Sequence, residues 1–226
     1  MNSSTKNSSS PAVKVMIVDD HPAVREALAI RIGSELDLAV CGEADDLGEA
    51  LQIAAATNPD VAIIDIALKT SSGIDLIKRL KVHHEKMRII VWSMYGEQLY
   101  AERAVRAGAA GYLTKANSTG QIIDAIRDVL AGNVFLSASM TMKLLKRTVG
   151  QSPEDSARSG IDLLSDREME VFRLIGQGVK PQEIALQLHL SVNTIETYRD
   201  RIRAKLNLSD ALELTRCALQ WVLEIG

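Results

Sequence analysis

The chain has 226 residues, of which 46% are hydrophobic and 24% charged, with a formal net charge of −3 at pH 7. This composition indicates a globular protein of ordinary polarity, and the length suits two domains better than one. The net charge excludes a uniformly basic protein, so any nucleic-acid binding must come from a local patch.

The N-terminal segment MNSSTKNSSS is polar and of low complexity, so we expect residues 1–12 to form a disordered tail and not a signal peptide. No stretch approaches about 18 consecutive apolar residues, so we expect no membrane span and no membrane partner. Cys41 and Cys217 fit no metal-binding spacing and are predicted to be free thiols in a reducing compartment. The expected location is the cytoplasm.

Between residues 13 and 132, short apolar runs alternate with amphipathic stretches. Five runs have the length and composition of buried strands, namely VKVMIV, LAVCGEA, VAIIDI, MRIIVWS and AAGYLTK. A helical pattern follows each run. Apolar strands separated by amphipathic helices favour a parallel sheet with helices on both faces. The predicted fold class is therefore α/β, with a five-stranded, doubly wound parallel sheet over residues 13–132.

After residue 132 the alternation stops. Residues 133–160 are predicted to be a linker with one short helix from about Ser137 to Arg147, because QSPEDSARSG at 151–160 is polar and aperiodic. Residues 161–226 show only helical patterns with short breaks. We expect them to form a second, all-α domain of four helices.

Polar side chains stand where four of the predicted strands end. They are Asp19 and Asp20, Asp65, Ser93 and Lys115. In a doubly wound sheet these ends meet at one edge, which is where such folds place their sites. Carboxylates gathered there repel one another and need a cation, and oxygen ligands suit Mg²⁺. Lys115 and Ser93 can bind an anion carried by a carboxylate, so the set predicts phosphoryl transfer to a carboxylate.

These residues, together with GYLTK at 111–115, resemble the receiver domains of response regulators, the CheY-like family with a flavodoxin-like fold. The resemblance implies a phosphoacceptor aspartate, a Mg²⁺ site, a lysine that pairs with the phosphoryl group, and a pair of switch residues. In this sequence these are Asp65 as phosphoacceptor; Asp19, Asp20, Asp65 and the backbone carbonyl of Ala67 for Mg²⁺; Lys115; and Ser93 with Tyr112 as the switch pair.

The loop after Asp65 departs from the pattern of many receivers. Leu68 and Lys69 stand where Met-Pro is common, and Ala67 brings no side-chain donor or acid to the site. The spacing of eight residues from Asp65 to Gly73 is the same as in the receiver pattern. Phosphorylation is still expected.

The segment from 161 onward has the features of a helix-turn-helix. Ser165 and Glu168 form a capping-box pattern, and a short helix around Glu183–Leu188 is followed by a tight break. Ser191 is placed to cap a longer helix from Val192 to about Leu206. A short helix, a tight turn and a second helix with a polar start are typical of DNA binding through the second helix.

This segment is similar to the LuxR-type DNA-binding domain of the NarL/FixJ response regulators, on the match LSDRE…GQGVKPQEIALQLHLSVNTIETYRDRIRAKLNL. The resemblance places the helix from Val192 in the major groove. Candidates for base edges or nearby backbone are Asn193, Thr194, Glu196, Thr197 and Asp200, and candidates for phosphate contacts are Arg199, Arg201, Arg203 and Lys205.

The charge of this helix is unusual for a DNA-binding surface. Residues 161–226 hold eight Lys and Arg against ten Asp and Glu, yet 199–205 hold four basic residues and one acid. The positive charge is therefore local. Glu196 and Asp200 stand where many relatives carry basic residues, and a carboxylate can accept a hydrogen bond from a cytosine amino group.

Taken together, the two resemblances imply a bacterial two-component response regulator that a sensor histidine kinase phosphorylates. It would bind double-stranded DNA as a phosphorylation-dependent homodimer, with RNA polymerase as a further candidate partner. It would not be an enzyme beyond Mg²⁺-dependent self-phosphorylation and autodephosphorylation. For the dimer, Leu212, Ala218, Leu219 and Val222 form either a seam or an intradomain core face.

Two other interpretations stay open. One is a phosphorylation-independent DNA-binding regulator whose receiver serves only for dimerisation. The other is a small α/β phosphatase-like enzyme with an unrelated helical tail, against which Ala67 stands because it occupies the place of the second acid in a DxD arrangement.

Overall fold

The computed structural model describes residues 11–68, 71–116, 120–148 and 160–225. Its N-terminal part is a five-stranded, all-parallel sheet in the order β2-β1-β3-β4-β5. The strands are β1 (Val13–Val18), β2 (Leu38–Ala44), β3 (Val61–Ile64), β4 (Arg88–Ser93) and β5 (Gly111–Thr114). The predicted α/β class with a doubly wound parallel sheet is confirmed.

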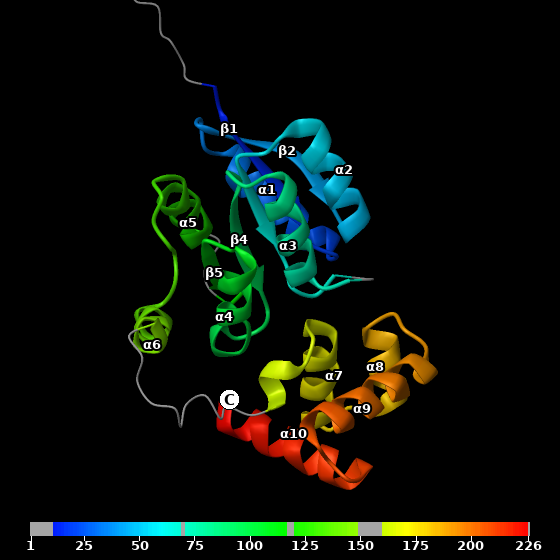
Figure 1. Cartoon of the computed structure of the whole chain (residues 1–226). Helices are drawn as coiled ribbons and strands as arrows, with labels where there is room; N and C mark the ends of the chain where they lie inside the picture. The colour runs from blue at the N-terminus through cyan, green and yellow to red at the C-terminus, as the bar shows by residue number, and fades with distance from the viewer. Residues whose placement is uncertain (1–10, 69–70, 117–119, 149–159, 226) are drawn as a thin grey trace, which may run out of the picture.

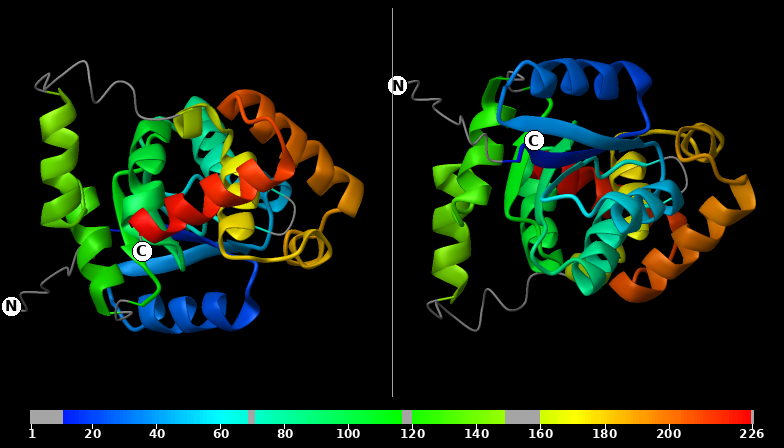
Figure 2. Two further views of the ribbon diagram at one scale, coloured as in Figure 1. Left: turned by 90° about the horizontal axis from the view of Figure 1, so that it is seen from below. Right: turned by 90° about the horizontal axis from the view of Figure 1, so that it is seen from above.

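A helix follows each strand, as the alternation predicts. These helices are α1 (Pro22–Gly33), α2 (Leu47–Thr57), α3 (Gly73–His83), α4 (Glu97–Ala107) and α5 (Gly120–Leu130). Figure 1 shows them wrapped around the sheet, and in Figure 2 α1 lies at the edge of the molecule away from the C-terminal helices.

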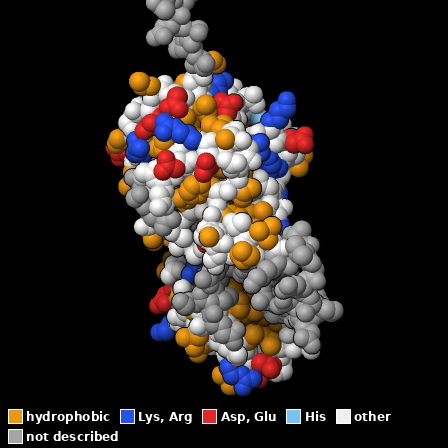
Figure 3. All heavy atoms as spheres, turned by 90° about the vertical axis from the view of Figure 1, so that its left-hand side faces the viewer, with side chains coloured by type: hydrophobic (Ala, Val, Ile, Leu, Met, Phe, Trp, Pro, Cys, Tyr) orange, Lys and Arg blue, Asp and Glu red, His pale blue; other side chains and the backbone are white. Residues whose placement is uncertain are grey.

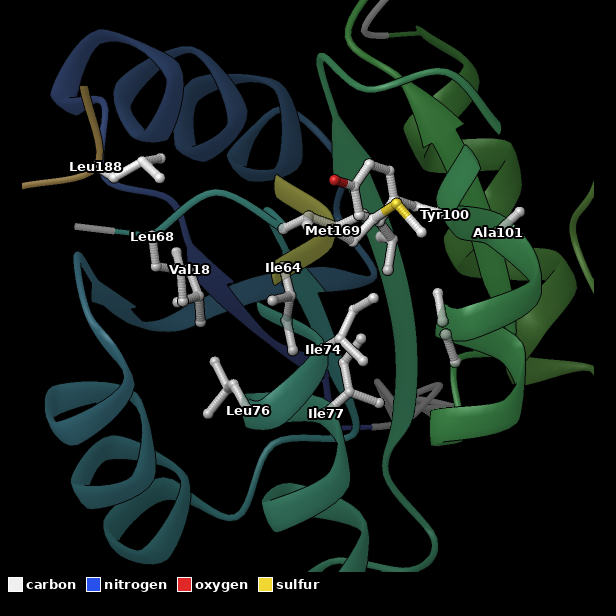
Figure 4. Close-up of a cluster of buried hydrophobic side chains, with 14 of the residues drawn as sticks. Val18, Ile64, Leu68, Ile74, Leu76, Ile77, Tyr100, Ala101, Met169 and Leu188 are labelled. Atoms are coloured by element: carbon white, nitrogen blue, oxygen red, sulfur yellow. The ribbon is translucent and has the colours of Figure 1, made fainter. Parts of the chain in front are cut away.

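Strands β1, β3 and β4 bury side chains on both of their faces, whereas the edge strand β2 is partly exposed. In β1, Val15 and Ile17 belong to one core with α1 and α5, whereas Met16 and Val18 belong to another with α2, α3 and α4. Side chains alternate across a strand, so continuous apolar runs supply both cores at once. The second core continues into the C-terminal helices, as the cluster in Figure 4 shows.

The C-terminal part is helical. It contains η2 (Gly160–Leu163), α7 (Asp166–Gly176), α8 (Pro181–Gln187), α9 (Val192–Leu206) and α10 (Ala211–Ile225). The Ser165 side chain accepts a hydrogen bond from the Glu168 N–H in a complete capping box, and Ser191 caps α9 by accepting from the Thr194 N–H. Both caps lie where the sequence predicts them.

Between these parts lies α6 (Ala138–Thr148), close to the helix predicted from Ser137 to Arg147. It is anchored on α4, where Glu97 Oε1 accepts a hydrogen bond of 2.8 Å from the Ser137 N–H. Met142 and Leu145 stay exposed, and Figure 3 shows hydrophobic side chains gathered on this side of the molecule. Residues 1–10 of the predicted tail and 149–159 of the predicted linker lie outside the described residues.

The structure assigns one of the four residues for which a dimer seam and an intradomain core face were both predicted. Ala218 is fully buried and belongs to the intradomain core, whereas Leu212 and Leu219 are exposed and Val222 is half-buried, so a seam formed by these three stays a prediction. A Cβ added to Gly176 would lie 2.3 Å from the Ala218 carbonyl oxygen, so α7 and α10 approach each other at a position that only glycine allows. No helix of the described residues is both long and apolar enough to span a bilayer.

Candidate functional site

The polar residues predicted at the strand ends converge in the structure. Lys115 Nζ lies 2.6 Å from Oδ2 of Asp19 and 2.5 Å from Oδ2 of Asp65. Ser93 Oγ donates a hydrogen bond of 2.6 Å to Oδ1 of Asp65. Asp19, Asp65 and Ser93 are all buried. One ammonium and one hydroxyl therefore face a pair of buried carboxylates.

Adjacent strands bring these side chains together. Asp19 follows β1, Asp65 follows β3, Ser93 ends β4 and Lys115 follows β5, and these four strands are neighbours in the sheet. Backbone hydrogen bonds fix the positions of the strand ends along the sheet. The Asp65 N–H donates to the Val18 carbonyl at 2.8 Å, and the Lys115 N–H donates to the Ser93 carbonyl at 2.8 Å.

Gly73 at the start of α3 fits closely beneath this edge. A Cβ there would lie 2.0 Å from the carbonyl oxygen of Asp65 and 2.9 Å from Cα of Ile66. Its N–H donates to the Ile66 carbonyl at 2.8 Å. The preserved spacing from Asp65 to Gly73 therefore has a steric cause: only glycine lets the loop fold back against the strand end.

Burial and the charges of Asp19, Asp65 and Lys115 shift the pKa values of this cluster. Burial raises the pKa of Asp65, and the Lys115 ammonium and the Ser93 hydroxyl oppose that rise. Burial alone would lower the pKa of Lys115, but Asp65 and Asp19 together raise it. Lys115 therefore stays protonated and offers a fixed positive charge to an anion on Asp65.

A third acid, Asp20, completes an oxygen-rich cluster. Asp19, Asp20, His21 and Asp65 place ligand atoms within 4.8 Å of one another. Oδ1 of Asp20 is buried and has no hydrogen bond of acceptable geometry within the described residues, although His21 Nδ1 lies 2.6 Å away. Ala67 lies at the same edge, where its N–H donates to Oδ1 of Asp65 at 3.3 Å. Carboxylates with an unused oxygen suit a hard divalent cation such as Mg²⁺.

The predicted switch residues both point inward. Tyr112 is buried, and its hydroxyl donates a hydrogen bond of 2.8 Å to the backbone carbonyl of Tyr95. Burial raises the pKa of Tyr112 well above its usual range, so the hydroxyl remains a donor. The sequence leads us to expect Tyr112 to follow Ser93 inward on phosphorylation, and this structure already has the inward arrangement.

The second candidate surface lies on α9. Asn193, Glu196, Thr197 and Asp200 are exposed along one side of it, and Thr194 is partly covered by its hydrogen bond with Ser191. Two predicted phosphate ligands are already paired on the same helix, Arg199 with Glu196 at 2.9 Å and Arg203 with Asp200 at 2.5 Å.

Lys205 stands apart from the rest of the basic stretch. Its ammonium lies 2.6 Å from Glu168 Oε2 and donates to the Leu163 carbonyl at 3.1 Å. Burial raises the pKa of Glu168, but Lys205 and Ser165 outweigh it and the pKa falls. Lys205 therefore joins α9 to the start of α7, in addition to any contact with a phosphate.

Comparison with known proteins identifies both parts. Residues 15–127 match the response regulator receiver domain family, and residues 162–218 match the bacterial regulatory proteins of the luxR family. A putative transcriptional regulator from Pseudomonas aeruginosa is 37% identical over 195 residues, which cover 86% of this chain and 91% of that protein. The response regulator GacA of the same species is 31% identical over 208 residues, which cover 92% of this chain and 96% of GacA. The chain belongs to the response regulators with a LuxR-type DNA-binding domain.

This response regulator is therefore a transcription regulator with a CheY-like receiver and a helix-turn-helix output. A solved structure of the response regulator RcsB from Salmonella enterica serovar Typhimurium, bound to a promoter in the presence of the phosphomimetic BeF3⁻, is 26% identical to it. The match covers 92% of this chain and 97% of the RcsB chain, with a TM-score of 0.55.

One group of contacts in the response regulator has no signal in the sequence. Asp166 at the start of α7 accepts hydrogen bonds from Lys78 of α3 and Arg103 of α4, and the Tyr95 hydroxyl donates to Glu170. The partners are 63 to 88 residues apart in the chain. No periodicity or motif links them, and each charge by itself resembles an ordinary solvated side chain.

Proposed function

We propose that this response regulator accepts a phosphoryl group on Asp65 from a sensor histidine kinase, and that the phosphorylated form binds double-stranded DNA as a homodimer. The observation that carries the proposal is the placement of Asp65, a buried carboxylate held between the Lys115 ammonium and the Ser93 hydroxyl. We propose residues 13–132 as the receiver and 161–226 as the DNA-binding domain, with 133–160 as the segment between them.

In the proposed transfer, a carboxylate oxygen of Asp65 attacks the phosphorus of the kinase phosphohistidine. A P–O bond forms, the P–N bond breaks, and the departing imidazole keeps the bond's electron pair and takes up a proton. Lys115 pairs with the oxygens of the new acyl phosphate and Ser93 donates a hydrogen bond to them. Acetyl phosphate can serve as a small donor by the same step, and water attack on phosphorus returns the free carboxylate.

The acidic cluster fits Mg²⁺. Asp19, Asp20, Asp65 and the backbone carbonyl of Ala67 would hold it, and the gathering of three carboxylates, whose ligand atoms lie within 4.8 Å of one another, supports this assignment. When bound, the cation offsets the negative charge that gathers on the phosphoryl oxygens. Asp19 also orients Lys115, which bridges it to Asp65.

For the output, α9 is proposed to enter the major groove with Asn193, Thr194, Glu196, Thr197 and Asp200 near the bases. Arg199, Arg201, Arg203 and Lys205 would contact phosphates. Since Arg199 and Arg203 are paired with acids on the same helix, they must exchange a carboxylate for a phosphate on binding. A dimer matches an operator of two half-sites. The proposed activity belongs in the cytoplasm, where the chromosome and RNA polymerase are accessible.

Oligomeric mass tests this proposal. Light scattering with Mg²⁺, before and after addition of beryllofluoride, should show a monomer that becomes a dimer in the wild type and stays a monomer in Asp65→Asn. Operator selection with the activated wild type should then enrich a two-half-site sequence. If wild type and Asp65→Asn have the same mass and the same DNA binding in every condition, the phosphorylation-independent alternative is correct.

A further inference from the structure

The DNA-binding domain docks on the receiver through α7 and η2. Figure 1 shows α7 below α3 and α4, and Figure 4 shows Met169 of α7 next to Tyr100 of α4. Both side chains are almost fully buried and belong to one hydrophobic cluster. The contact therefore has an apolar centre formed by side chains from both domains.

Polar groups clasp the two domains around this centre. Asp166 is buried and accepts from Lys78 Nζ at 3.1 Å and from Arg103 Nη1 at 3.2 Å. Arg103 also donates to the carbonyls of Leu164 at 2.8 Å and Ile161 at 3.0 Å. One receiver arginine thus binds the first residues of the DNA-binding domain at three points. The bond between Arg103 and Asp166 is mostly buried and charge-assisted, so it is stronger than an exposed ion pair, whereas the side chain of Lys78 is 56% exposed and its bond contributes less.

Tyr95, in the loop between β4 and α4, contacts the DNA-binding domain through its side chain. Its hydroxyl donates to Glu170 Oε1 at 3.0 Å, and the Arg173 guanidinium lies 4.4 Å from the centre of its ring. The ring also stacks on Tyr100, with 5.0 Å between centroids. Burial and Glu170 raise the pKa of Tyr95 above its usual range, so its hydroxyl is a donor at every working pH.

The backbone of Tyr95 contacts the switch pair. Its carbonyl accepts the Tyr112 hydroxyl at 2.8 Å, and its N–H donates to Ser93 Oγ at 3.4 Å. The two neighbours of Tyr95 do little to fix the loop. The Met94 side chain is exposed, and a Cβ added at Gly96 would meet nothing within 4 Å. The position of the Tyr95 carbonyl, and with it the inward position of Tyr112, therefore depends on the Tyr95 side chain.

We propose that docking of the DNA-binding domain holds Tyr95, and through it Ser93 and Tyr112, in the inward arrangement, so that docking and phosphorylation of Asp65 favour one another. This inference rests on the proposed function, because it needs Asp65 to be the phosphoacceptor. We infer positive coupling, in which docking favours phosphorylation, because the docked domain and the inward switch pair occur together in the structure and both contact Tyr95. Linkage then requires the effect to be reciprocal, with breaking of the interface weakening the phosphoryl site.

The recognition helix takes no part in this clasp. The interdomain hydrogen bonds described above all come from η2, α7 and Leu164 between them, and Asn193, Glu196, Thr197 and Asp200 of α9, which are proposed to face the bases, are exposed. Docking therefore leaves the proposed base-reading side of α9 open, and its effect is on the receiver.

The test is the dissociation constant of beryllofluoride, measured in the full chain with Mg²⁺ by tryptophan fluorescence, with Trp221→Phe in every protein so that the signal comes from Trp92. This indole stands next to Ser93, and Lys115 Nζ lies 6.0 Å from its ring. The variants Arg103→Ala and Glu170→Ala remove interface contacts from opposite domains, and neither residue belongs to the phosphoryl site. The matched control is Arg106→Ala on the same helix, since Arg106 is 69% exposed and pairs with Glu102 of its own helix.

The interface variants should bind beryllofluoride about fivefold or more weakly than the wild type, and Arg106→Ala should stay within about twofold. Equal affinity in wild type, Arg103→Ala and Glu170→Ala would overturn the inference, and tighter binding would show that docking opposes phosphorylation. Failure of the wild type itself to bind beryllofluoride would instead overturn the proposed function. Melting curves of each variant establish that the two domains remain folded.

Discussion

The ammonium of Lys115 lies 2.5 Å from the carboxylate of Asp65, and both side chains are more than nine-tenths buried. Asp19, at 2.6 Å from the same ammonium, is buried as well. Two carboxylates thus share one positive charge in a place where water cannot screen them. The arrangement suits a site that gains further negative charge on Asp65 and needs a fixed cation to receive it.

Lys115→Met should destabilise the protein in a pH-dependent way. Removing one partner of a buried pair leaves Asp19 and Asp65 uncompensated, so the free energy of unfolding should fall by about 3 kcal/mol near neutral pH. Burial already raises the pKa of Asp65, and loss of the ammonium raises it further. A carboxyl whose pKa is raised by folding contributes stability that is lost as the pH rises through that pKa, so acidification should restore part of it.

Urea denaturation of Lys115→Met at neutral and mildly acidic pH checks this expectation. The exposed Lys86 provides the control, because Lys86→Met removes the same charge from the surface. If Lys115→Met loses no more stability than Lys86→Met at neutral pH, the Lys115 ammonium does not compensate the buried carboxylates.

Mg²⁺ should stabilise the wild type and not Asp20→Asn. The binding free energy adds about 1.4 kcal/mol to unfolding at tenfold excess over the dissociation constant. Asp20 is the suitable position for the change, because its Oδ1 is buried without a well-formed hydrogen bond and its loss breaks no interaction with Lys115. Thermal melts with Mg²⁺ and with chelator give the measurement. An equal shift in both proteins would place the cation elsewhere.

Gly73→Ala should disturb the site through the backbone. The new Cβ would lie 2.0 Å from the Asp65 carbonyl oxygen, so the loop or the strand end must move. We expect a loss of about 2 kcal/mol or more, as for other strained small-to-large changes, and slower phosphoryl uptake. Gly33→Ala is the matched control, since an added Cβ at the end of α1 meets nothing within 4 Å. Equal stability of the two variants would refute the steric explanation of the Asp65–Gly73 spacing.

On α9, the arginines and their acidic neighbours should have opposite effects on DNA affinity. Removing both Arg199 and Arg203 should reduce the slope of log affinity against log salt by about two, one for each lost phosphate contact. Glu196→Gln with Asp200→Asn should strengthen non-sequence-specific binding, because the arginines then give up no ion pair. Arg216→Ala on α10 serves as the control, being 77% exposed and off this helix. Titrations at several salt concentrations measure both effects, and an unchanged slope would mean that α9 docks differently.

Much of this fold could be predicted because it depends on local patterns. Apolar runs and amphipathic stretches specify strands and helices, and strand order then brings Asp19, Asp65, Ser93 and Lys115 to one edge. Caps such as Ser165 and Ser191 involve residues three apart, which the sequence displays directly.

The interdomain clasp could not be predicted in this way. Asp166, Glu170 and Arg103 become buried partners only when two separately predicted domains meet, and the surfaces that meet depend on the shapes of both. For the same reason the sequence could not decide the role of Ala218, because its burial against Gly176 depends on how closely α7 approaches α10. It also explains Lys205, whose ammonium bonds to Glu168, 37 residues away.

Phosphorylation of Asp65 is tested most directly by phosphoryl uptake from acetyl phosphate with Mg²⁺, followed by intact mass of the wild type and of Asp65→Asn. We expect one phosphoryl group on the wild type, located by peptide mapping to the peptide that contains Asp65, and none on the variant. Uptake by Asp65→Asn equal to that of the wild type, or a wild type that stays unmodified, would contradict this expectation.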